Sequence, residues 1–191
     1  MKAVDRHLGG LYPTHRHYIF DSKDDGDFDD YPGRISGDHC PRKPFGNAMY
    51  QVWHPIHLMP EEIEAWLDGI LRDAPAIVLI DELVHLRYKA SLYSPKYEEM
   101  QKTGRSKKII TLTGTQELGK IPGNAYKQAS HRFGFYVDKA AQYDRLVLNL
   151  LLKAKVEDPR DEWGFYYQGE KSRGDPLYFS SIQQFLGKGS S

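Results

Sequence analysis

A continuous apolar run near the middle of the chain constrains the fold more than any other feature. The stretch APAIVLIDELVHL, from Ala74 to Leu86, contains no polar residue before Asp81 and Glu82. A strand without polar alternation is buried on both faces, which is typical of a parallel sheet covered by helices on either side. The two adjacent acids therefore stand where a deeply buried strand leaves the core.

Strand-like and helical segments alternate around this run. The helix that begins at Pro60 has acids in its first turn and an apolar face at helical spacing. The alternation predicts an α/β fold with a mostly parallel sheet flanked by helices. The predicted elements are strands at Tyr18–Phe20, at Ala48–Pro55, in the quoted stretch and at 107–116, a loop at Gly33–Phe45, and helices from Pro60 and at Tyr97–Lys102.

The C-terminal part is predicted to differ from the rest. A strand at Arg132–Val137 and an amphipathic helix at Lys139–Lys155 are followed by two aromatic strands within residues 162–179, joined by a charged turn. The last residues, 187–191, are expected to fray. We therefore expect a core domain over residues 1–155 and a small β-rich appendage, a hairpin and tail, over residues 156–191.

Composition adds few limits. Lys and Arg together number 26, as do Asp and Glu, so the net charge favours neither a nucleic-acid nor a membrane partner. The single cysteine, Cys40, cannot form an intramolecular disulfide, and no apolar run reaches the length of a membrane span. Met1 is followed by polar residues instead of a signal-peptide core, so a reducing cytoplasm is the expected compartment.

Polar residues follow three of the predicted strands. In open parallel sheets the ligand site lies at the carboxyl ends of the strands, so Asp21, the pair Asp81-Glu82 and the pair Thr115-Gln116 are expected to converge. Two adjacent acids suit phosphate chemistry with Mg²⁺, because one can bind the hydrated metal while the other polarises a water. The alternative is structural: Asp81 caps the following helix and Glu82 occupies its first turn.

Four segments taken together resemble the FtsK/HerA group of P-loop ATPases, the ring-forming DNA pumps that include phage genome-packaging motors. In that group a strand ends in Asp-Glu, a helix ends in Gly-Arg and the next strand ends in Thr-Gln, and this order is matched over about residues 16–150. The segments are HYIFDSKDDGDF, AIVLIDEL, EEMQKTGRSKKIITLTGTQ and IPGNAYKQASHRFGFYVDKAAQYDR. The resemblance implies a RecA-like P-loop NTPase core.

The resemblance also implies roles for the residues at the strand ends. Asp81 would bind Mg²⁺ through water, Glu82 would be the catalytic base and Gln116 the sensor, with Thr115 and Asp21 beside the bound ATP. Arg105 would be an arginine finger that reaches the nucleotide of an adjacent subunit, which is chemically reasonable for a guanidinium. A solvated Arg105 in the basic run GRSKK is an equal alternative.

Further implications concern partners and location. The resemblance implies double-stranded DNA as the partner, a homo-oligomeric ring of five or six subunits, and the host cytoplasm if the protein is phage-encoded. The tyrosine-rich loop Tyr88–Lys96 is the candidate DNA contact. Arg132 is a weaker candidate for the site and is more easily explained as an ion-pair partner near the sheet. The spacing His54-x-x-His57 could offer two zinc ligands, although strand-end histidines are the more common explanation.

The phosphate-binding loop of such ATPases is not found in the sequence. Gly9-Gly10 lacks the Lys-Ser/Thr that holds phosphate and metal, and MKAVDRHLGG reads as the last turns of a helix that ends at Gly9 or Gly10. Either Met1 is internal and an extension of about 20–30 residues carries a strand and this loop, or nucleotide binding has been lost. We expect the 191 residues alone to bind ATP weakly.

Two rival functions stay open at this stage. The chain could be a truncated or inactive ATPase-like subunit that acts only as an assembly module. It could also be a phosphate-handling enzyme that uses Asp21 and Asp81 on another α/β scaffold.

Overall fold

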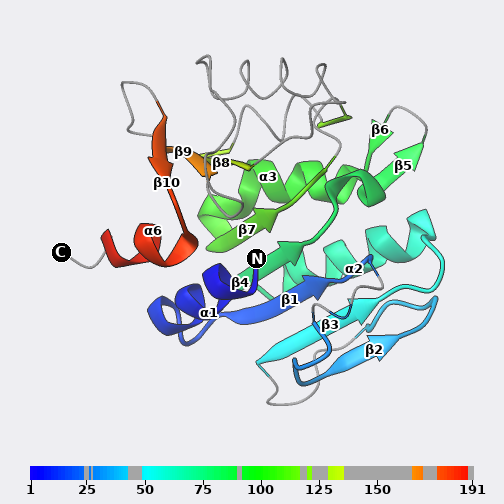
Figure 1. The fold of residues 1–191 in the computed structure, drawn as a ribbon. Coiled ribbons are helices and arrows are strands. Elements are labelled where there is room, and N and C mark those ends of the chain that lie inside the picture. The colour runs from blue at the N-terminus through cyan, green and yellow to red at the C-terminus, as the bar shows by residue number, and fades with distance from the viewer. Residues whose placement is uncertain are drawn as a thin grey trace. The chain divides into compact units, whose positions relative to one another are not determined.

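The computed structural model describes residues 1–23, 26, 28–42, 49–89, 92–116, 120–121, 129–135, 165–169 and 176–188. The chain divides into two compact units, residues 1–116 and 117–191, and each is described by itself (Figure 1). Among the described residues, no helix combines the length and the apolar character that crossing a membrane requires.

Five parallel strands form the sheet of the first unit, which confirms the predicted fold class. Their order across the sheet is β2-β3-β1-β4-β7, and β4, buried along its whole length, pairs with β1 on one side and β7 on the other. The strands are β1 (Arg16–Phe20), β2 (Arg34–Ser36), β3 (Tyr50–His54), β4 (Ala76–Ile80) and β7 (Ile109–Thr113).

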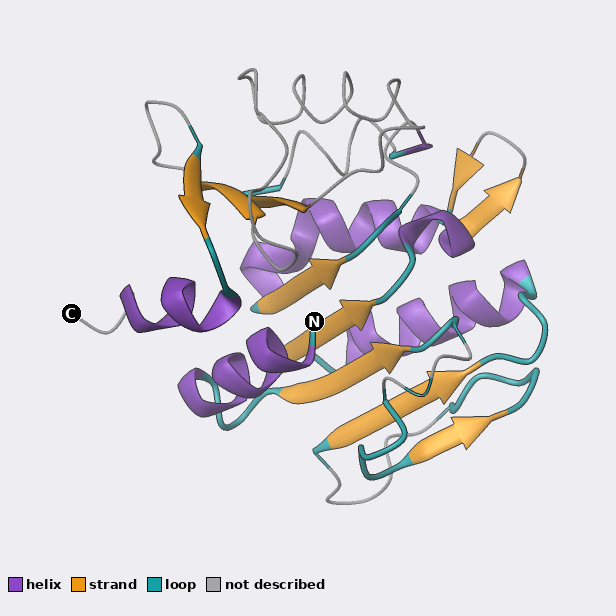
Figure 2. Cartoon of the chain, in the orientation of Figure 1, coloured by secondary structure: helices purple, strands orange, loops and turns teal. Residues whose placement is uncertain are grey.

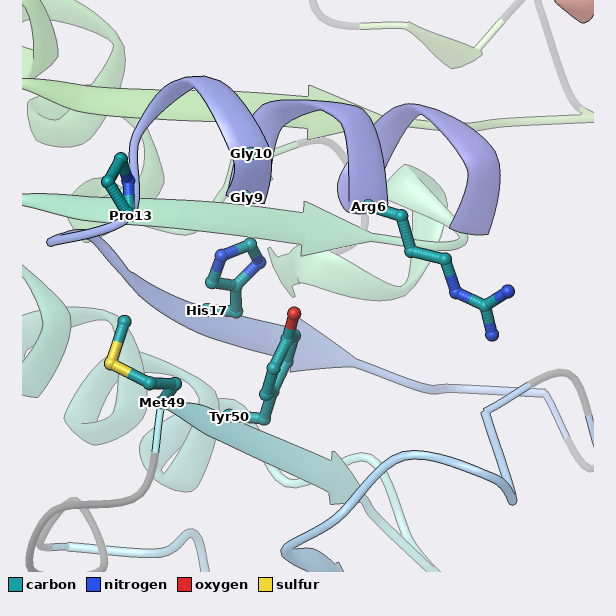
Figure 3. A pocket seen from close by; sticks show the side chains of 7 residues that line it. All are labelled: Arg6, Gly9, Gly10, Pro13, His17, Met49 and Tyr50. Atoms are coloured by element: carbon teal, nitrogen blue, oxygen red, sulfur yellow. The ribbon is translucent and has the colours of Figure 1, made fainter.

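Helices cover both faces of this sheet (Figure 2). On one face lies α1 (Lys2–Leu11), toward which His17 of β1 and Tyr50 of β3 point (Figure 3). On the other face lie α2 (Pro60–Arg72) and α3 (Pro95–Lys107), which contact each other. Trp66 of α2 packs against Tyr18 and Phe20 of β1. Alternate residues of β1 thus face opposite helix layers, as the strand period requires.

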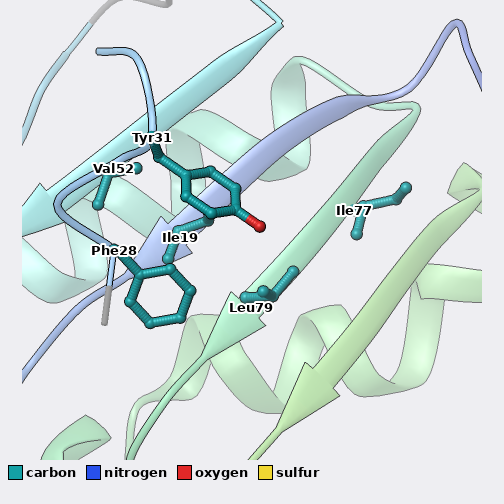
Figure 4. Packing of buried hydrophobic residues seen from close by; sticks show 6 residues of the cluster. All are labelled: Ile19, Phe28, Tyr31, Val52, Ile77 and Leu79. Carbon is teal, nitrogen blue, oxygen red and sulfur yellow. The ribbon is translucent and has the colours of Figure 1, made fainter. Parts of the chain in front are cut away.

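The core on the α1 side is closed by a loop as well as by the helix. Phe28 and Tyr31, which follow β1 in the chain, lie over the sheet beside Ile19 and Val52 (Figure 4). Leu8 of α1 packs against the same cluster. Two aromatic residues from a segment that reads as an acidic loop therefore complete the apolar layer.

Several predicted boundaries needed correction. The strand β2 lies inside the segment predicted as a loop, because a three-residue edge strand leaves no periodic signal. The helix α3 is longer than predicted at both ends. Ser94 caps its start, and because only three of its residues are buried the apolar pattern does not mark its full length. Helix α1 continues to Leu11, and its C-cap is Tyr12 instead of Gly9 or Gly10, with the Tyr12 N–H donating to the Leu8 carbonyl.

The connection from β4 to α3 has structure of its own. A 3₁₀ turn, η1 (Leu83–Leu86), directly follows the acidic pair. A short antiparallel ladder of β5 (Arg87–Lys89) and β6 (Leu92–Tyr93) then leads into α3. The predicted DNA-contacting loop, Tyr88–Lys96, overlaps this ladder and includes the first two residues of α3.

The second unit contains a small antiparallel sheet, as the prediction of a β-rich appendage requires. Its order is β10-β9-β8, with bounds His131–Phe135 for β8, Phe165–Gly169 for β9 and Leu177–Phe179 for β10. Its core is aromatic: Phe165 contacts Phe133 and Phe179, and Phe185 of α6 (Ile182–Lys188) packs on all three.

Three predictions for this unit had different outcomes. The predicted fraying is wrong for Gly187 and Lys188, which belong to α6. The predicted helix Lys139–Lys155 and residues 136–137 of the predicted strand lie outside the described residues. The proposed domain boundary at residue 155 stays a prediction, whereas the compact units divide after Gln116 and β8 pairs with β9.

Candidate functional site

The carboxyl ends of β1, β4 and β7 lie side by side. The pairing register places Phe20 opposite Ile80 and Ile80 opposite Thr113. The backbone continues this ladder one step beyond the strands, because the Asp81 N–H donates to the Phe20 carbonyl at 3.2 Å and the Gly114 N–H donates to the Ile80 carbonyl at 2.8 Å. The strand-end residues thus share one edge of the sheet.

Asp81 lies at this edge with an ammonium group beside it. Its side chain is 12% exposed, and Lys23 Nζ lies 3.3 Å from Asp81 Oδ2 and 3.9 Å from Glu82 Oε2. Lys23 was missed in the sequence, where it stands in the acidic loop after β1. A basic residue two positions beyond a strand-end acid is the signal that could have identified it. A cation between these two carboxylates is thus part of the fold.

Glu82 ties the ends of two strands together. It is 4% exposed. Its Oε2 accepts a hydrogen bond from the Gln116 N–H at 3.1 Å, and its Oε1 accepts one from the Val84 N–H at 3.5 Å, which caps η1. The structural alternative assigned the cap to Asp81, and the structure assigns it to Glu82. Glu82 is therefore an anion held in a fixed place next to Asp81.

Asp21 is directed toward the other side of the sheet. Its carboxylate is fully buried, with Arg34 Nη2 of β2 and His54 Nδ1 of β3 lying 3.3 and 3.6 Å from Oδ2. The His54 ring also contacts the Asp21 carbonyl at 2.8 Å. Buried carboxylates need such partners. Asp21 thus shares the edge with Asp81, but its charged neighbours belong to β2 and β3.

The residues after β7 reach the site through their backbone. Thr115 is half-buried and the Gln116 side chain is exposed, while the Gln116 N–H holds Glu82. Gly114 is needed for close approach: a Cβ there would lie 2.7 Å from the Asp81 carbonyl oxygen and 2.5 Å from Met1 Cε. The exits of β4 and β7 therefore touch at Gly114.

The first residue of the chain lies at the same edge. Met1 precedes α1 and contacts Gly114, so the amino-terminal end of α1 lies beside the acidic pair (Figure 1). The first N–H groups of a helix have no partner within the helix and carry partial positive charge. This end of α1 thus adds electropositive character to the site, in addition to Lys23.

Arg105 does not join this site within the chain. It is exposed in the last turn of α3, and α3 leads into the amino end of β7. The acidic pair lies at the carboxyl ends. Arg132 lies in the second unit, where its guanidinium donates to Gln168 Oε1 at 3.2 Å.

The other candidates have structural partners. His54 contacts Asp21 and His57 contacts Asp38, and no group of three or more His, Cys, Asp or Glu within the described part of the chain is placed to hold a metal. In the predicted DNA loop, the Lys96 ammonium pairs with Asp68 and Glu99 at 3.0 and 2.9 Å. Lys96 therefore joins α2 to α3.

The acidic pair fits a metal that arrives with a ligand. Mg²⁺ in phosphate sites is usually held by one or two carboxylates, with water and substrate phosphates completing its shell. Asp81 offers a carboxylate whose side chain is 12% exposed, next to the more deeply buried carboxylate of Glu82. The residues present thus suit Mg²⁺ bound together with a phosphate group better than a metal held by protein alone.

Comparisons with known proteins give structural matches only. No protein-family model and no curated protein sequence matches the chain. The DNA-packaging ATPase B204 from Sulfolobus turreted icosahedral virus is similar with a TM-score of 0.65 and 13% identity, over 94% of this chain and 90% of that one. The genome packaging NTPase B204 from Sulfolobus turreted icosahedral virus 2, in complex with AMPPCP, gives a TM-score of 0.58 and 14% identity, over 89% and 98%.

A further structure of that second protein, in complex with ATP-gammaS, matches with a TM-score of 0.57 over the same shares. At 13–14% identity these likenesses show the fold. The chain has a P-loop NTPase-like α/β fold, with a mostly parallel five-stranded sheet flanked by helices and a small antiparallel sheet.

Proposed function

We propose that the chain is a subunit of an ATP-driven motor that moves or packages double-stranded DNA, of the FtsK/HerA type. The observation that carries this proposal is the acidic pair Asp81-Glu82 at an edge shared by the ends of β4 and β7 and the amino-terminal end of α1. The likeness to packaging NTPases whose structures contain AMPPCP or ATP-gammaS supports it.

In this proposal the two acids divide the chemistry. Asp81, the more exposed of the two side chains, would hold the hydrated Mg²⁺ of the nucleotide, and Glu82 would polarise the attacking water as the general base. Mg²⁺ supplies charge neutralisation on the phosphates when it is bound. The hydrogen bond from the Gln116 N–H fixes Glu82, so movement of the β7 end would displace the base. Gln116 would then sense the state of the nucleotide, with Thr115 beside the bound ATP.

Lys23 gains a role that the sequence did not suggest. Its ammonium lies against Asp81 and Glu82, in the position of a counter-cation for both carboxylates. When a nucleotide and its metal enter, that charge is free to turn toward the phosphates. Lys23 would then contribute to phosphate binding in addition to positioning the acids.

Arg105 would act only on a neighbouring subunit. Its place in the last turn of α3, away from the carboxyl ends, suits a finger that is supplied in trans within a ring. Its side chain is exposed. The ring of five or six subunits and the DNA contact at Tyr88–Lys96 are proposed from the resemblance alone.

The test uses the chain with a strand and a Gly-Lys-Ser/Thr loop fused ahead of Met1, because residues placed there enter at the carboxyl ends of β4 and β7. We expect negligible hydrolysis by the 191 residues and Mg²⁺-dependent, DNA-stimulated hydrolysis by the extended chain. Glu82→Gln should lower that rate by about 100-fold or more. Glu61→Gln, an exposed acid in the first turn of α2, is the matched control.

Unchanged hydrolysis in Glu82→Gln would overturn the assigned base. If the extended chain binds no nucleotide but still assembles with DNA or with copies of itself, the rival function as an assembly module is correct. Rings of Arg105→Ala subunits alone should lose activity. Mixed rings with Glu82→Gln subunits should regain it, because the Glu82→Gln subunit still supplies Arg105 to a neighbour that still has Glu82. Absence of recovery would place Arg105 outside the active interface.

A further inference from the structure

A lysine ammonium takes the place of a cation at the acidic edge. Lys23 Nζ lies 3.3 Å from Asp81 Oδ2 and 3.9 Å from Glu82 Oε2, so it is a neighbour of both carboxylates. These two side chains are the ones that the proposed function assigns to Mg²⁺ and to the attacking water. A divalent cation beside them would meet the ammonium at close range, where like charges repel strongly. Metal that binds at this edge must therefore displace the Lys23 ammonium.

Two side-chain contacts hold the chain just before Lys23. His54 Nδ1 lies 2.8 Å from the Asp21 carbonyl oxygen, and His85 Nδ1 lies 2.8 Å from Ser22 Oγ. His54 is the last residue of β3 and His85 belongs to η1. The start of the loop is thus attached to the sheet on one side and to the turn after the acidic pair on the other. The base of the Lys23 side chain therefore has a fixed place beside the two carboxylates.

The end of this side chain is held less firmly than its base. The Lys23 side chain is 27% exposed, against 12% for Asp81 and 6% for Glu82. Both of its distances to the acids exceed the length of about 2.7–2.9 Å that is usual for a hydrogen bond between an ammonium and a carboxylate. The Lys96 ammonium, by contrast, lies 3.0 and 2.9 Å from its two carboxylate partners. The flexible stem of Lys23 thus allows its charge to leave the acids while the loop stays in place.

Free metal and phosphate-bound metal meet different charges at this edge. While the ammonium is in place, it compensates part of the negative charge that would attract a hydrated divalent cation. A phosphate group can draw the ammonium away, because lysine is a common phosphate ligand. Metal that arrives on a phosphate therefore brings the group that uncovers its own carboxylates. Metal that arrives alone has to compete with Lys23.

We propose that Lys23 excludes divalent metal that arrives alone, so that the acidic edge takes metal only together with a phosphate. Lys23 is then a specificity-determining residue of the metal site, which acts through the charge that Asp81 and Glu82 present. The inference rests on the proposed function for the identity of the phosphate compound, a nucleotide. The competition between ammonium and metal rests only on the contacts of Lys23 with the two acids.

The test uses Mn²⁺ as the probe, without nucleotide, on the 191-residue chain. Mn²⁺ takes the same carboxylate and water ligands as Mg²⁺, and water-proton relaxation reports the fraction that is bound to protein. Lys23→Met should tighten binding of Mn²⁺ alone by about tenfold or more, because one nearby charge changes the proton affinity of a carboxylate by at least that factor. Lys23→Arg, which keeps the charge, should bind Mn²⁺ as weakly as the parent chain. Inorganic tripolyphosphate should tighten Mn²⁺ binding in the parent chain more than in Lys23→Met.

Two further variants locate the effect. Adding Asp81→Asn to Lys23→Met should remove the gain, because it removes the proposed ligand. Lys102→Met is the matched control: it also removes one positive charge, from an exposed lysine 3.7 Å from Glu98 on α3, and should leave Mn²⁺ binding unchanged. Equal Mn²⁺ affinity in Lys23→Met and the parent chain, or a gain that survives Asp81→Asn, overturns the proposal.

The outcome is separate from that of the hydrolysis test. Tighter Mn²⁺ binding by Lys23→Met supports the competition even if the extended chain hydrolyses no ATP. Unchanged Mn²⁺ binding overturns the competition and leaves the Glu82→Gln test of hydrolysis as it stands. A parent chain that binds Mn²⁺ alone as tightly as Mn²⁺ with tripolyphosphate would also overturn the proposed selection.

Discussion

The two ends of the parallel sheet carry acids in different settings. At the amino end, Asp5 is buried with donors at 2.6 and 2.9 Å, and Asp73 accepts two hydrogen bonds from Arg16 at 2.8 Å and one from Tyr18. At the carboxyl end, Asp81 is approached by a flexible lysine at 3.3 Å. Short contacts to rigid partners stabilise a fold, whereas a long contact to a mobile ammonium leaves a carboxylate able to exchange its cation.

The largest effect on stability is expected from Asp5→Ala. It leaves the Tyr31 hydroxyl and the His17 ring buried without their common partner, and losing one member of a buried pair costs about 3–5 kcal/mol. Asp30→Ala is the control, because Asp30 forms exposed ion pairs with Lys2 and Arg6, which contribute little to stability, and it should cost far less than Asp5→Ala. Urea unfolding measures both, and equal costs would contradict the contrast.

Gly114→Ala tests the close approach at the carboxyl end. A methyl group there meets the Asp81 carbonyl at 2.7 Å, so the exits of β4 and β7 must separate. We expect a loss of about 1–3 kcal/mol in the free energy of unfolding. Gly69→Ala, in open space on α2, should instead gain about 0.5–1 kcal/mol. A neutral Gly114→Ala would mean that the two strand ends move apart easily.

Glu62 shows that an acid on the carboxyl side can also be structural. The Cys40 N–H donates to it at 2.9 Å and His39 lies at 3.1 Å, which lowers the pKa of Glu62 to about 2. A carboxyl whose pKa is lowered by folding stabilises the folded state at pH values above its unfolded-state pKa. This stabilisation is lost as the pH falls toward 2. Glu62→Gln should therefore cost about 1 kcal/mol at pH 7.

Thermal unfolding at pH 7 and at pH 2.5 checks this prediction. The difference between Glu62→Gln and the parent chain should shrink at the lower pH, because the Glu62 carboxyl is then protonated in the unfolded chain and begins to be protonated in the folded one. Glu61→Gln, at the exposed neighbouring position, should show no pH-dependent difference. A difference that stays constant with pH would show that the charge of Glu62 is not what stabilises the loop around Cys40.

Asp81→Asn should have the smallest effect. Its ion pair with Lys23 is partly exposed, and such pairs contribute about 0–1 kcal/mol. The measurement is again urea unfolding, now beside the Asp5→Ala result. A cost above about 2 kcal/mol would show that Asp81 is as deeply built into the fold as Asp5, and would weaken its assignment as a metal ligand.

The sequence was informative about the site where local pattern and sheet geometry act together. Apolar runs predicted β1, β4 and β7, and parallel strands bring the residues that follow them to one edge. Lys23 could not be placed in this way. It lies in a loop without periodicity, and its contact with Asp81 joins residues that are 58 positions apart in the sequence. The His17–Asp5 pair escaped notice for a similar reason, since it joins a helix to a strand through tertiary packing alone.

Local chemistry also misassigned a helix cap. Asp is statistically the better N-cap residue. In the structure the Asp81 N–H still pairs with the neighbouring strand, so the chain leaves the sheet only at Glu82, which caps η1. Arg105 shows the reverse case. Its distance from the acids follows from chain order alone, because a helix that precedes a parallel strand ends at that strand's amino end.

By itself, the sequence determined the layered α/β architecture and the position of Asp81 and Glu82, because burial and strand period are written in the residue pattern. The tertiary structure alone decided which groups those acids meet. Hydrogen bonds and ion pairs between distant segments, such as Gln116 with Glu82 and Asp5 with His17, depend on how the elements pack. Those contacts separate an acid that can accept a ligand's cation from one that holds the fold together.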